Sequence, residues 1–149
     1  MKYSFFFLFL FTLLSCKDED PDFRAQNEAD IKAYIDENNL DATRTNSGLY
    51  IIVDEQGTGA QPTATDNVTV VYKGYFLNGA VFDPGKESGT TFSLKSVILG
   101  WTEGIPYFKE GGKGKLLVPA HLGYGSDGYP PFIPGGAVLI FDVELISVN

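Results

Sequence analysis

Side chains that perform covalent chemistry are scarce in this chain. It contains one histidine, His121, and one cysteine, Cys16, so a Ser-His-Asp arrangement has one possible base and a Cys-His pair needs that single thiol. No cluster of Cys or His is present, and the acidic run at residues 18–22 lacks the spacing and the glycine of a calcium loop. Residues 111–115, GGKGK, do not match a phosphate-binding loop. We therefore expect no nucleophilic catalysis, no metal site and no cofactor.

Aromatic side chains, in contrast, make up 14% of the residues, and many lie in three segments. The first reads VVYKGYF and then NGAVFD (70–83), the second VILGWTEG (97–104), and the third contains LGYG, IP and LIFDVEL (119–145). In this order they resemble the FKBP family of peptidyl-prolyl cis-trans isomerases: its strand, hairpin and Phe-Asp pair, its Val-Ile-x-Gly-Trp-x-Glu-Gly signature, and its Tyr-Gly loop with the closing strand. The resemblance covers residues 48–149, about two thirds of the chain.

The resemblance implies a pocket that holds the ring of a substrate proline. Trp101 would form the floor, and the walls would be Tyr72, Phe82, Phe92, Val97, Ile98, Ile133 and Phe141. Tyr124 would donate a hydrogen bond to a substrate carbonyl, and the Ile98 backbone N–H would hold another. Asp83 would orient pocket side chains and bias the electric field at the amide. The expected catalytic residues are Asp83, Tyr124, Phe82 and Trp101.

Prolyl isomerisation suits such a chain because it breaks no covalent bond. The rotational barrier of a peptide bond is about 18–20 kcal/mol, while the two planar forms of an X-Pro bond differ by roughly 0.5–1 kcal/mol. A catalyst needs to bind the twisted amide more tightly than either planar form, in a dry pocket with aromatic walls. The resemblance therefore implies an enzyme that acts on proline-containing polypeptides without a cofactor.

Each of these residues also has a purely structural interpretation. A lone Trp or Phe in a β-rich domain usually belongs to the core, and Asp83 before Pro84-Gly85 is typical of a turn. Tyr124 lies between two glycines, where a phenol has little packing reason. The main alternative function is a binding or chaperone module with an apolar groove and little catalysis. A third is a structural lipoprotein in which the N-terminal segment does the recognising.

The sequence departs from the best-known family members at two loops. Ser88 lies where those members place an arginine, so an Asp-Arg pair in the pocket is lost unless Lys86 replaces it. Residues 129–132 read Tyr-Pro-Pro-Phe, which enlarges the aromatic rim. The resemblance implies a pocket that binds macrolide inhibitors, and these two changes would alter that binding.

Local patterns indicate the elements that must position these residues. Apolar spacing, notably Ile31 with Tyr34 and Ile35, predicts one helix over residues 24–40, followed by a polar connector at 41–47. From residue 49 onward, β-favouring runs separated by Gly and Pro turns predict strands at 49–53, 68–76, 116–119 and 137–148, with one short helix around 101–108. We expect an α+β domain at residues 48–149, an antiparallel sheet curled around one short helix, with the N-terminal helix outside it.

The first fifteen residues differ in composition from the rest. Phe5 to Leu14 is almost wholly Phe and Leu, too short to span a bilayer as a helix, and predicts a cleaved export signal. The ending Leu-Leu-Ser-Cys16 resembles a bacterial lipobox, in which the cysteine is acylated and becomes the new N-terminus. An ordinary cleaved signal with an incidental cysteine is the plainer interpretation. Residues 16–47 would then hold the lipidated Cys16, an acidic tether and the helix.

Charge limits the partners. The formal net charge is −8 and the eleven basic residues are scattered, which excludes a nucleic-acid partner. An acidic body gains nothing from an anionic lipid surface, so acyl chains would have to hold the protein at the membrane. We expect a lipid-anchored protein of the bacterial cell envelope, at the outer membrane, on its periplasmic or surface side.

Overall fold

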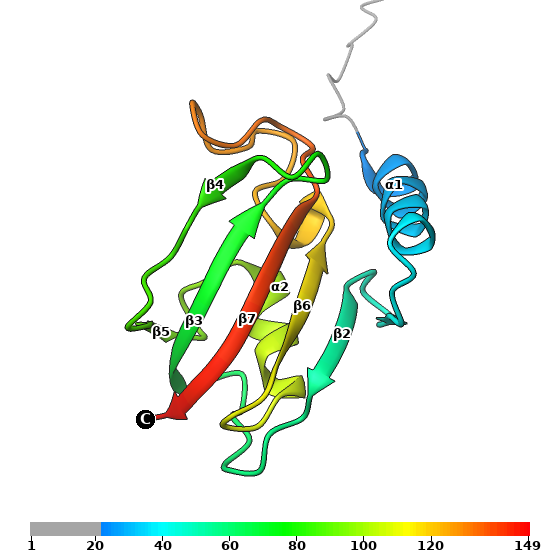
Figure 1. The fold of residues 1–149 in the computed structure, drawn as a ribbon. Helices are drawn as coiled ribbons and strands as arrows, with labels where there is room; N and C mark the ends of the chain where they lie inside the picture. The colour runs from blue at the N-terminus through cyan, green and yellow to red at the C-terminus, as the bar shows by residue number, and fades with distance from the viewer. Residues whose placement is uncertain (1–21) are drawn as a thin grey trace, which may run out of the picture.

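A computed structural model describes residues 22–149 (Figure 1). The predicted signal and the lipidation site Cys16 lie outside the described residues. In chain order the elements are α1 (Arg24–Glu37), β1 (Thr43–Arg44), β2 (Tyr50–Glu55), β3 (Asn67–Tyr75), β4 (Val81–Asp83), β5 (Thr90–Ser93), α2 (Leu99–Gly104), η1 (Ile105–Tyr107), β6 (Lys113–Val118), η2 (Ala120–Leu122) and β7 (Leu139–Val148).

The strands form one antiparallel sheet in the order β1-β2-β6-β7-β3-β4, and β5 pairs with the other end of β3. β7 lies between β6 and β3 and pairs with both over most of its length (Figure 1). Because side chains alternate across a strand, Leu139, Phe141, Val143 and Leu145 share one face, while Ile140 points to the other. The sheet therefore buries apolar side chains on both faces.

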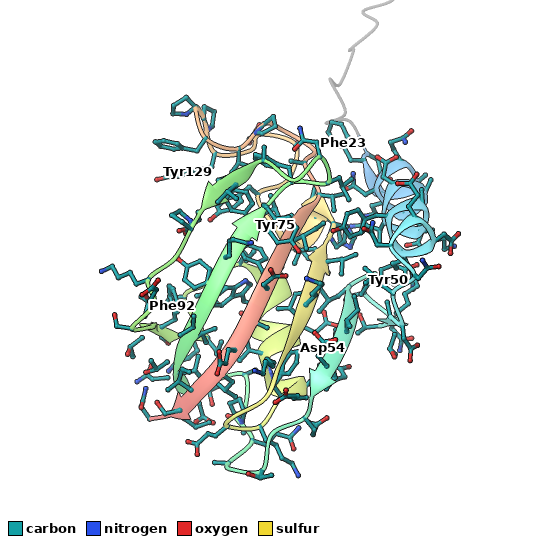
Figure 2. All side chains as sticks on the ribbon, in the orientation of Figure 1. Phe23, Tyr50, Asp54, Tyr75, Phe92 and Tyr129 are labelled. Carbon is teal, nitrogen blue, oxygen red and sulfur yellow. The ribbon has the colours of Figure 1, made fainter. Side chains whose placement is uncertain are left out.

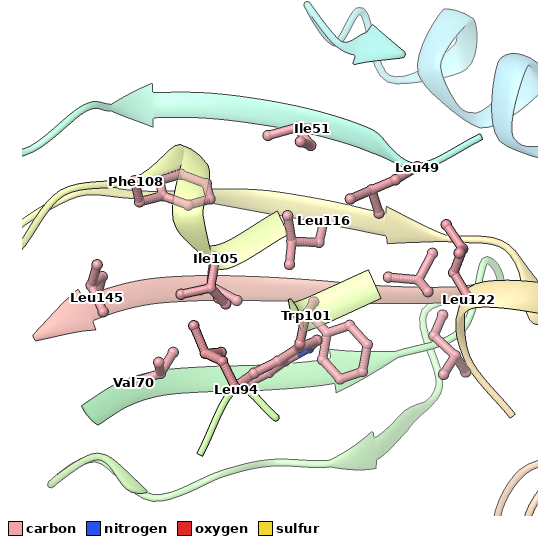
Figure 3. Packing of buried hydrophobic residues seen from close by; sticks show 14 of the residues in the cluster. Leu49, Ile51, Val70, Leu94, Trp101, Ile105, Phe108, Leu116, Leu122 and Leu145 are labelled. Carbon is pink, nitrogen blue, oxygen red and sulfur yellow. The ribbon is translucent and has the colours of Figure 1, made fainter. Parts of the chain in front are cut away.

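The main core fills the face covered by α2 and η1 (Figure 3). Two helix glycines allow this close packing: a Cβ at Gly100 would lie 2.6 Å from Val118 Cγ1, and one at Gly104 would lie 2.7 Å from Leu116 Cδ2. Any larger residue would push the helix off the sheet. The glycines thus bring Trp101, in the same helix, down onto the strands.

Helix α1 packs against the opposite face. Ile31 is fully buried there in a second cluster with Tyr50, Ile52, Leu117 and Ile140. At the helix side, Glu28 accepts hydrogen bonds from Tyr50 Oη at 2.6 Å and Arg44 Nε at 3.0 Å. At the ends of α1, Asp22 Oδ1 accepts a hydrogen bond from the Arg24 N–H at 3.0 Å, and Asn38 Nδ2 donates one to the Tyr34 carbonyl at 2.9 Å. Packing of its buried side against the sheet adds the larger part of its stability.

The predicted fold class is confirmed: a curled antiparallel sheet with one short helix, preceded by an N-terminal helix. Details differ. Residues 43–44, inside the expected connector, pair with β2, and the short strands β4 and β5 were not predicted. Strands of two to four residues are too short to show a periodicity. The short helix begins at Leu99, two residues earlier than expected, and none of the helices described over residues 22–149 could cross a membrane.

Candidate functional site

A hollow of about 470 Å³ opens on the α2 side of the sheet. Its lining comes from β3, β4, β5, the segment before α2, α2 itself, the loop after η2, and β7. The lining residues are Tyr72, Asp83, Phe92, Ser96, Val97, Ile98, Trp101, Tyr124 and Phe141. Segments far apart in the sequence therefore converge on one small site.

Trp101 lies at the centre of an aromatic cage. Its side chain is 3% exposed, and its ring meets those of Tyr72, Phe92 and Phe141 edge to face, at centroid distances of 5.1, 5.2 and 5.4 Å. Edge-to-face contacts of this kind are favoured by the ring quadrupoles and fix the ring orientations. The result is a rigid apolar floor.

Two local features hold this cage in place. Thr102 Oγ1 donates a hydrogen bond of 2.6 Å to the Leu94 carbonyl, which ties α2 to the segment that precedes it. In β3, a Cβ at Gly74 would lie 2.6 Å from Phe82 Cζ and 3.0 Å from Phe141 Cε1. Only glycine at position 74 lets both phenyl rings lie against the strand.

Asp83 is the fixed carboxylate of the site. Its Oδ2 accepts a hydrogen bond from Tyr72 Oη at 2.7 Å, and its Oδ1 accepts one from the Gly85 backbone N–H at 3.0 Å. Gly85 has φ +62°, and a Cβ there would collide with the Tyr72 carbonyl, so the turn that supplies this N–H requires glycine. Burial, and then the bond to Asp83, raise the pKa of Tyr72, which keeps its phenol a donor.

Among the described residues, Asp83 has no arginine partner in the site, and Lys86 does not replace one. Lys86 does not line the aromatic site; it lines a charged groove with Lys73, Lys115 and Asp142. Over residues 22–149, the ion pairs do not include one to Asp83. A tyrosine hydroxyl and a backbone amide hold the carboxylate instead.

Tyr124 is the polar group at the mouth. Its side chain is 39% exposed, and its ring packs against Tyr129 at a centroid distance of 5.6 Å, which in turn stacks on Phe132 at 6.2 Å. Partial burial, the neighbouring Tyr129 and Asp83 raise its pKa. Its hydroxyl forms no hydrogen bond with another described residue, so the donor is available to a ligand.

The structure brings eight of the ten sequence-predicted residues to the lining. The other two lie just behind it: Phe82 packs edge to face on Phe141 at 5.7 Å, and Ile133 is buried in the main core at 4% exposure. Ser96 lines the site and was not predicted, because a serine in a loop gives no sequence signal. The role of each residue stays a prediction. Among residues 22–149, no cluster of three potential metal ligands occurs.

Comparison with known proteins places this chain in a family. Residues 58–146 match the family model of the FKBP-type peptidyl-prolyl cis-trans isomerases. Two proteins named FKBP-type peptidyl-prolyl cis-trans isomerase FkpA are similar. That of Buchnera aphidicola subsp. Schizaphis graminum is 46% identical over 72% of this chain, and that of Escherichia coli K12 is 41% identical over 84%. The alignments cover only 43% and 47% of those proteins, so the chain spans about half the length of these relatives.

Solved structures agree with the sequence comparison. The crystal structure of FkpA from Escherichia coli superimposes with a TM-score of 0.74 at 40% identity, over 85% of this chain and 61% of that one. A peptidyl-prolyl cis-trans isomerase from Pseudomonas syringae pv. tomato gives a TM-score of 0.73 at 28% identity, over 88% of this chain and 98% of that one. From its sequence, its fold and its aromatic site, this chain belongs to the FKBP-type peptidyl-prolyl cis-trans isomerase family.

Proposed function

We propose that the chain catalyses cis-trans isomerisation of X-Pro peptide bonds, with the proline ring on Trp101. The observation that carries this proposal is the combination at one hollow of a dry aromatic floor, a free Tyr124 hydroxyl and an Asp83 carboxylate fixed by two hydrogen bonds. All of these groups suit the binding of a distorted amide.

The proposed mechanism depends on the loss of amide resonance when the X-Pro bond twists. Resonance between the nitrogen and the carbonyl ends at the midpoint of rotation, so the carbonyl carries less negative charge and loses less by leaving water. The aromatic rings around Trp101 would exclude water from that bond. Each tenfold acceleration requires about 1.4 kcal/mol of binding that favours the twisted form over the planar ones.

Three polar groups would orient the substrate. Tyr124 Oη would donate to one substrate carbonyl, and the Ile98 backbone N–H, which lies ahead of α2, would donate to another. Asp83 would hold Tyr72 in place and set the field at the amide nitrogen. Because two hydrogen bonds hold Asp83 before the substrate arrives, this carboxylate would need no reorganisation during rotation.

The test is the isomerisation rate of short X-Pro peptides with a soluble form that begins at Lys17. We expect clear acceleration, and a loss of it in Asp83→Ala and Tyr124→Phe. A folded protein without acceleration on several peptides would overturn the enzyme.

The exposed rings of Tyr129 and Phe132 favour the second candidate, a chaperone-like groove that binds unfolded chains. It predicts that the same soluble form suppresses aggregation of an unfolded protein even when it shows no isomerase activity. In that case Asp83→Ala would leave the suppression intact.

We further propose that the protein works in the bacterial cell envelope on exported, proline-containing polypeptides, held by lipid on Cys16. The Leu-Leu-Ser-Cys ending of the apolar leader and the bacterial origin of the similar proteins support this proposal. Residues 48–149 would be the isomerase domain, and 16–47 the anchor, tether and docking helix. Cys16→Ser should abolish incorporation of labelled palmitate and release the protein from membranes; unchanged membrane association would contradict it.

A macrolide inhibitor is a further candidate ligand for the Trp101 hollow. Trp101 is the only tryptophan in the chain, so its fluorescence reports occupancy of the site directly. Saturable change on titration with a macrolide of this class is the expected result, and no change at any concentration would contradict binding.

A further inference from the structure

Helix α1 carries a buried polar side chain, Asn27, that bonds to two distant parts of the chain. The side chain is 3% exposed, and its carboxamide is used on both sides. Oδ1 accepts a hydrogen bond from the Ala120 backbone N–H at 2.8 Å, and Nδ2 donates one to the Gly136 carbonyl at 3.1 Å. One partner is a donor and the other an acceptor, and the carboxamide of Asn27 satisfies both at once with two separate atoms.

Ala120 and Gly136 are the two ends of the loop that carries Tyr124. The same loop places Tyr129 and Phe132 at the rim, and it lies outside the sheet ladder. Within the loop, Gly125 N–H donates to the Ala120 carbonyl at 2.8 Å, and Gly136 N–H donates to the Gly125 carbonyl at 2.9 Å. Asn27 thus fixes the frame from which Tyr124 projects.

A second residue near the start of α1, Phe23, also contacts Gly136. The ring of Phe23, at the start of the helix, occupies the space where a side chain at Gly136 would lie. Figure 2 labels Phe23 where α1 comes close to the base of this loop, with Tyr129 at the far end. The helix is itself fixed to the sheet by the fully buried Ile31, so it can transmit the position of the rigid strands to the loop.

We propose that Asn27 is a positioning residue of the isomerase site. It holds the loop that carries Tyr124 in a fixed position relative to Trp101. This inference rests on the proposed function and gives α1 a role in it. Loss of either hydrogen bond leaves a buried backbone group without a partner, and the loop relieves that by moving. The Tyr124 hydroxyl then no longer meets the substrate carbonyl at the distance that catalysis requires.

The test compares variants in the full chain. Asn27→Ala removes both hydrogen bonds; Asn27→Asp keeps the acceptor for Ala120 N–H and loses the donor to Gly136. Gln26→Ala is the surface control, because Gln26 bonds only to Asp30 of the same helix. Ile31→Val is the packing control, since it loosens α1 without touching the loop.

Two measurements separate positioning from stability. In Asn27→Ala we expect amide hydrogen exchange to accelerate across residues 120–136 and not in β7, and kcat/KM to fall about tenfold while the protein stays folded. Asn27→Asp should fall between Asn27→Ala and the wild type. Gln26→Ala should keep the loop protected and the activity unchanged. Ile31→Val keeps both Asn27 hydrogen bonds, so it should lower the unfolding temperature with a smaller fall in kcat/KM than Asn27→Ala.

In a folded Asn27→Ala variant, retained protection of residues 120–136 or an unchanged kcat/KM would each overturn the proposal. If Asn27→Ala lowers the unfolding temperature as Ile31→Val does, with the loop still protected and kcat/KM unchanged, Asn27 is only a core residue and the proposal is wrong. If the wild type itself does not accelerate isomerisation, the proposed function fails, and the exchange of residues 120–136 still shows whether Asn27 holds the loop. Should Asn27→Ala not fold, Asn27→Asp decides by the same two measurements.

Discussion

The Tyr72 phenol donates a 2.7 Å hydrogen bond to Asp83 Oδ2, while the same ring stands at 88° to Trp101 with its centroid 5.1 Å away. One side chain thereby joins the charged group of the site to its apolar floor. In this chain the pair Tyr72–Asp83, rather than an ion pair, fixes the carboxylate. Several properties of the site follow from this arrangement.

Tyr72→Phe keeps the aromatic cage and removes only the hydroxyl. We expect kcat/KM to fall about tenfold, because Asp83 then keeps only the hydrogen bond from the Gly85 N–H and is held less firmly beside the amide. The free energy of unfolding should fall by about 1–2 kcal/mol through loss of a part-buried hydrogen bond to a charged acceptor. Peptide isomerisation kinetics and urea unfolding measure the two effects.

The chain offers a matched control on the other face of the sheet. Tyr75 Oη donates to Asp142 Oδ1 at 2.8 Å and accepts from Lys115 Nζ at 3.2 Å. Tyr75→Phe therefore removes a bond of the same kind, together with the one from Lys115, on the face opposite the hollow. This variant should lose stability and keep full activity. Equal loss of activity in both variants would mean that stability, not Asp83, controls turnover.

Gly74→Ala tests the space that the cage needs. The new methyl group would lie 2.6 Å from Phe82 Cζ, so the ring must shift, and overpacking of this kind costs roughly 1–3 kcal/mol. Phe82→Leu in the same chain frees that space, and the double variant should recover part of the lost stability. Additive losses in a double-mutant cycle would show that the two residues do not share the space.

Local sequence patterns predict much of this fold, but they do not predict much of the site. From residue 139 to 145, β7 has an apolar residue at every second position, so its core face could be predicted. The three family segments pointed to the lining of the site. Asn27 could not be assigned, because nothing in a helical pattern indicates hydrogen bonds to residues 93 and 109 positions away. The same holds for Lys86, whose direction depends on the turn at Gly85 rather than on its own identity.

Acid should weaken the docking of α1. Hydrogen bonds from Tyr50 and Arg44 hold the pKa of Glu28 below its ordinary value of 4.5, with the bond from Tyr50 the largest cause. A carboxyl with a lowered pKa stabilises the fold above its unfolded value, and that contribution is lost as pH falls through the folded pKa. Glu28→Gln should therefore be less stable than the wild type by about 1 kcal/mol at neutral pH.

The difference between Glu28→Gln and the wild type should shrink below pH 4.5, where the wild-type carboxylate also becomes protonated. Thermal unfolding over a pH series measures it. Glu37→Gln is the control, because Glu37 is exposed on the same helix and contacts no basic group within residues 22–149. A difference that stays constant with pH would show that Glu28 acts by packing alone.

Alkaline pH, in contrast, should leave the site working past the point where a free tyrosine ionises. Burial, Tyr129 and Asp83 raise the pKa of Tyr124 above its ordinary value of 10.0. A raised tyrosine pKa favours the neutral phenol, so the contribution of Tyr124 is complete below pH 10.0 and is lost as pH rises through the folded pKa.

The isomerisation rate, measured by NMR exchange without a coupled protease, should therefore be constant from neutral pH to pH 10. The tyrosinate absorbance of the wild type minus that of Tyr124→Phe should show one late transition. If instead activity falls with a midpoint near 10.0, together with a tyrosinate signal that Tyr124→Phe lacks, the phenol is not shielded and the field of Asp83 does not reach it.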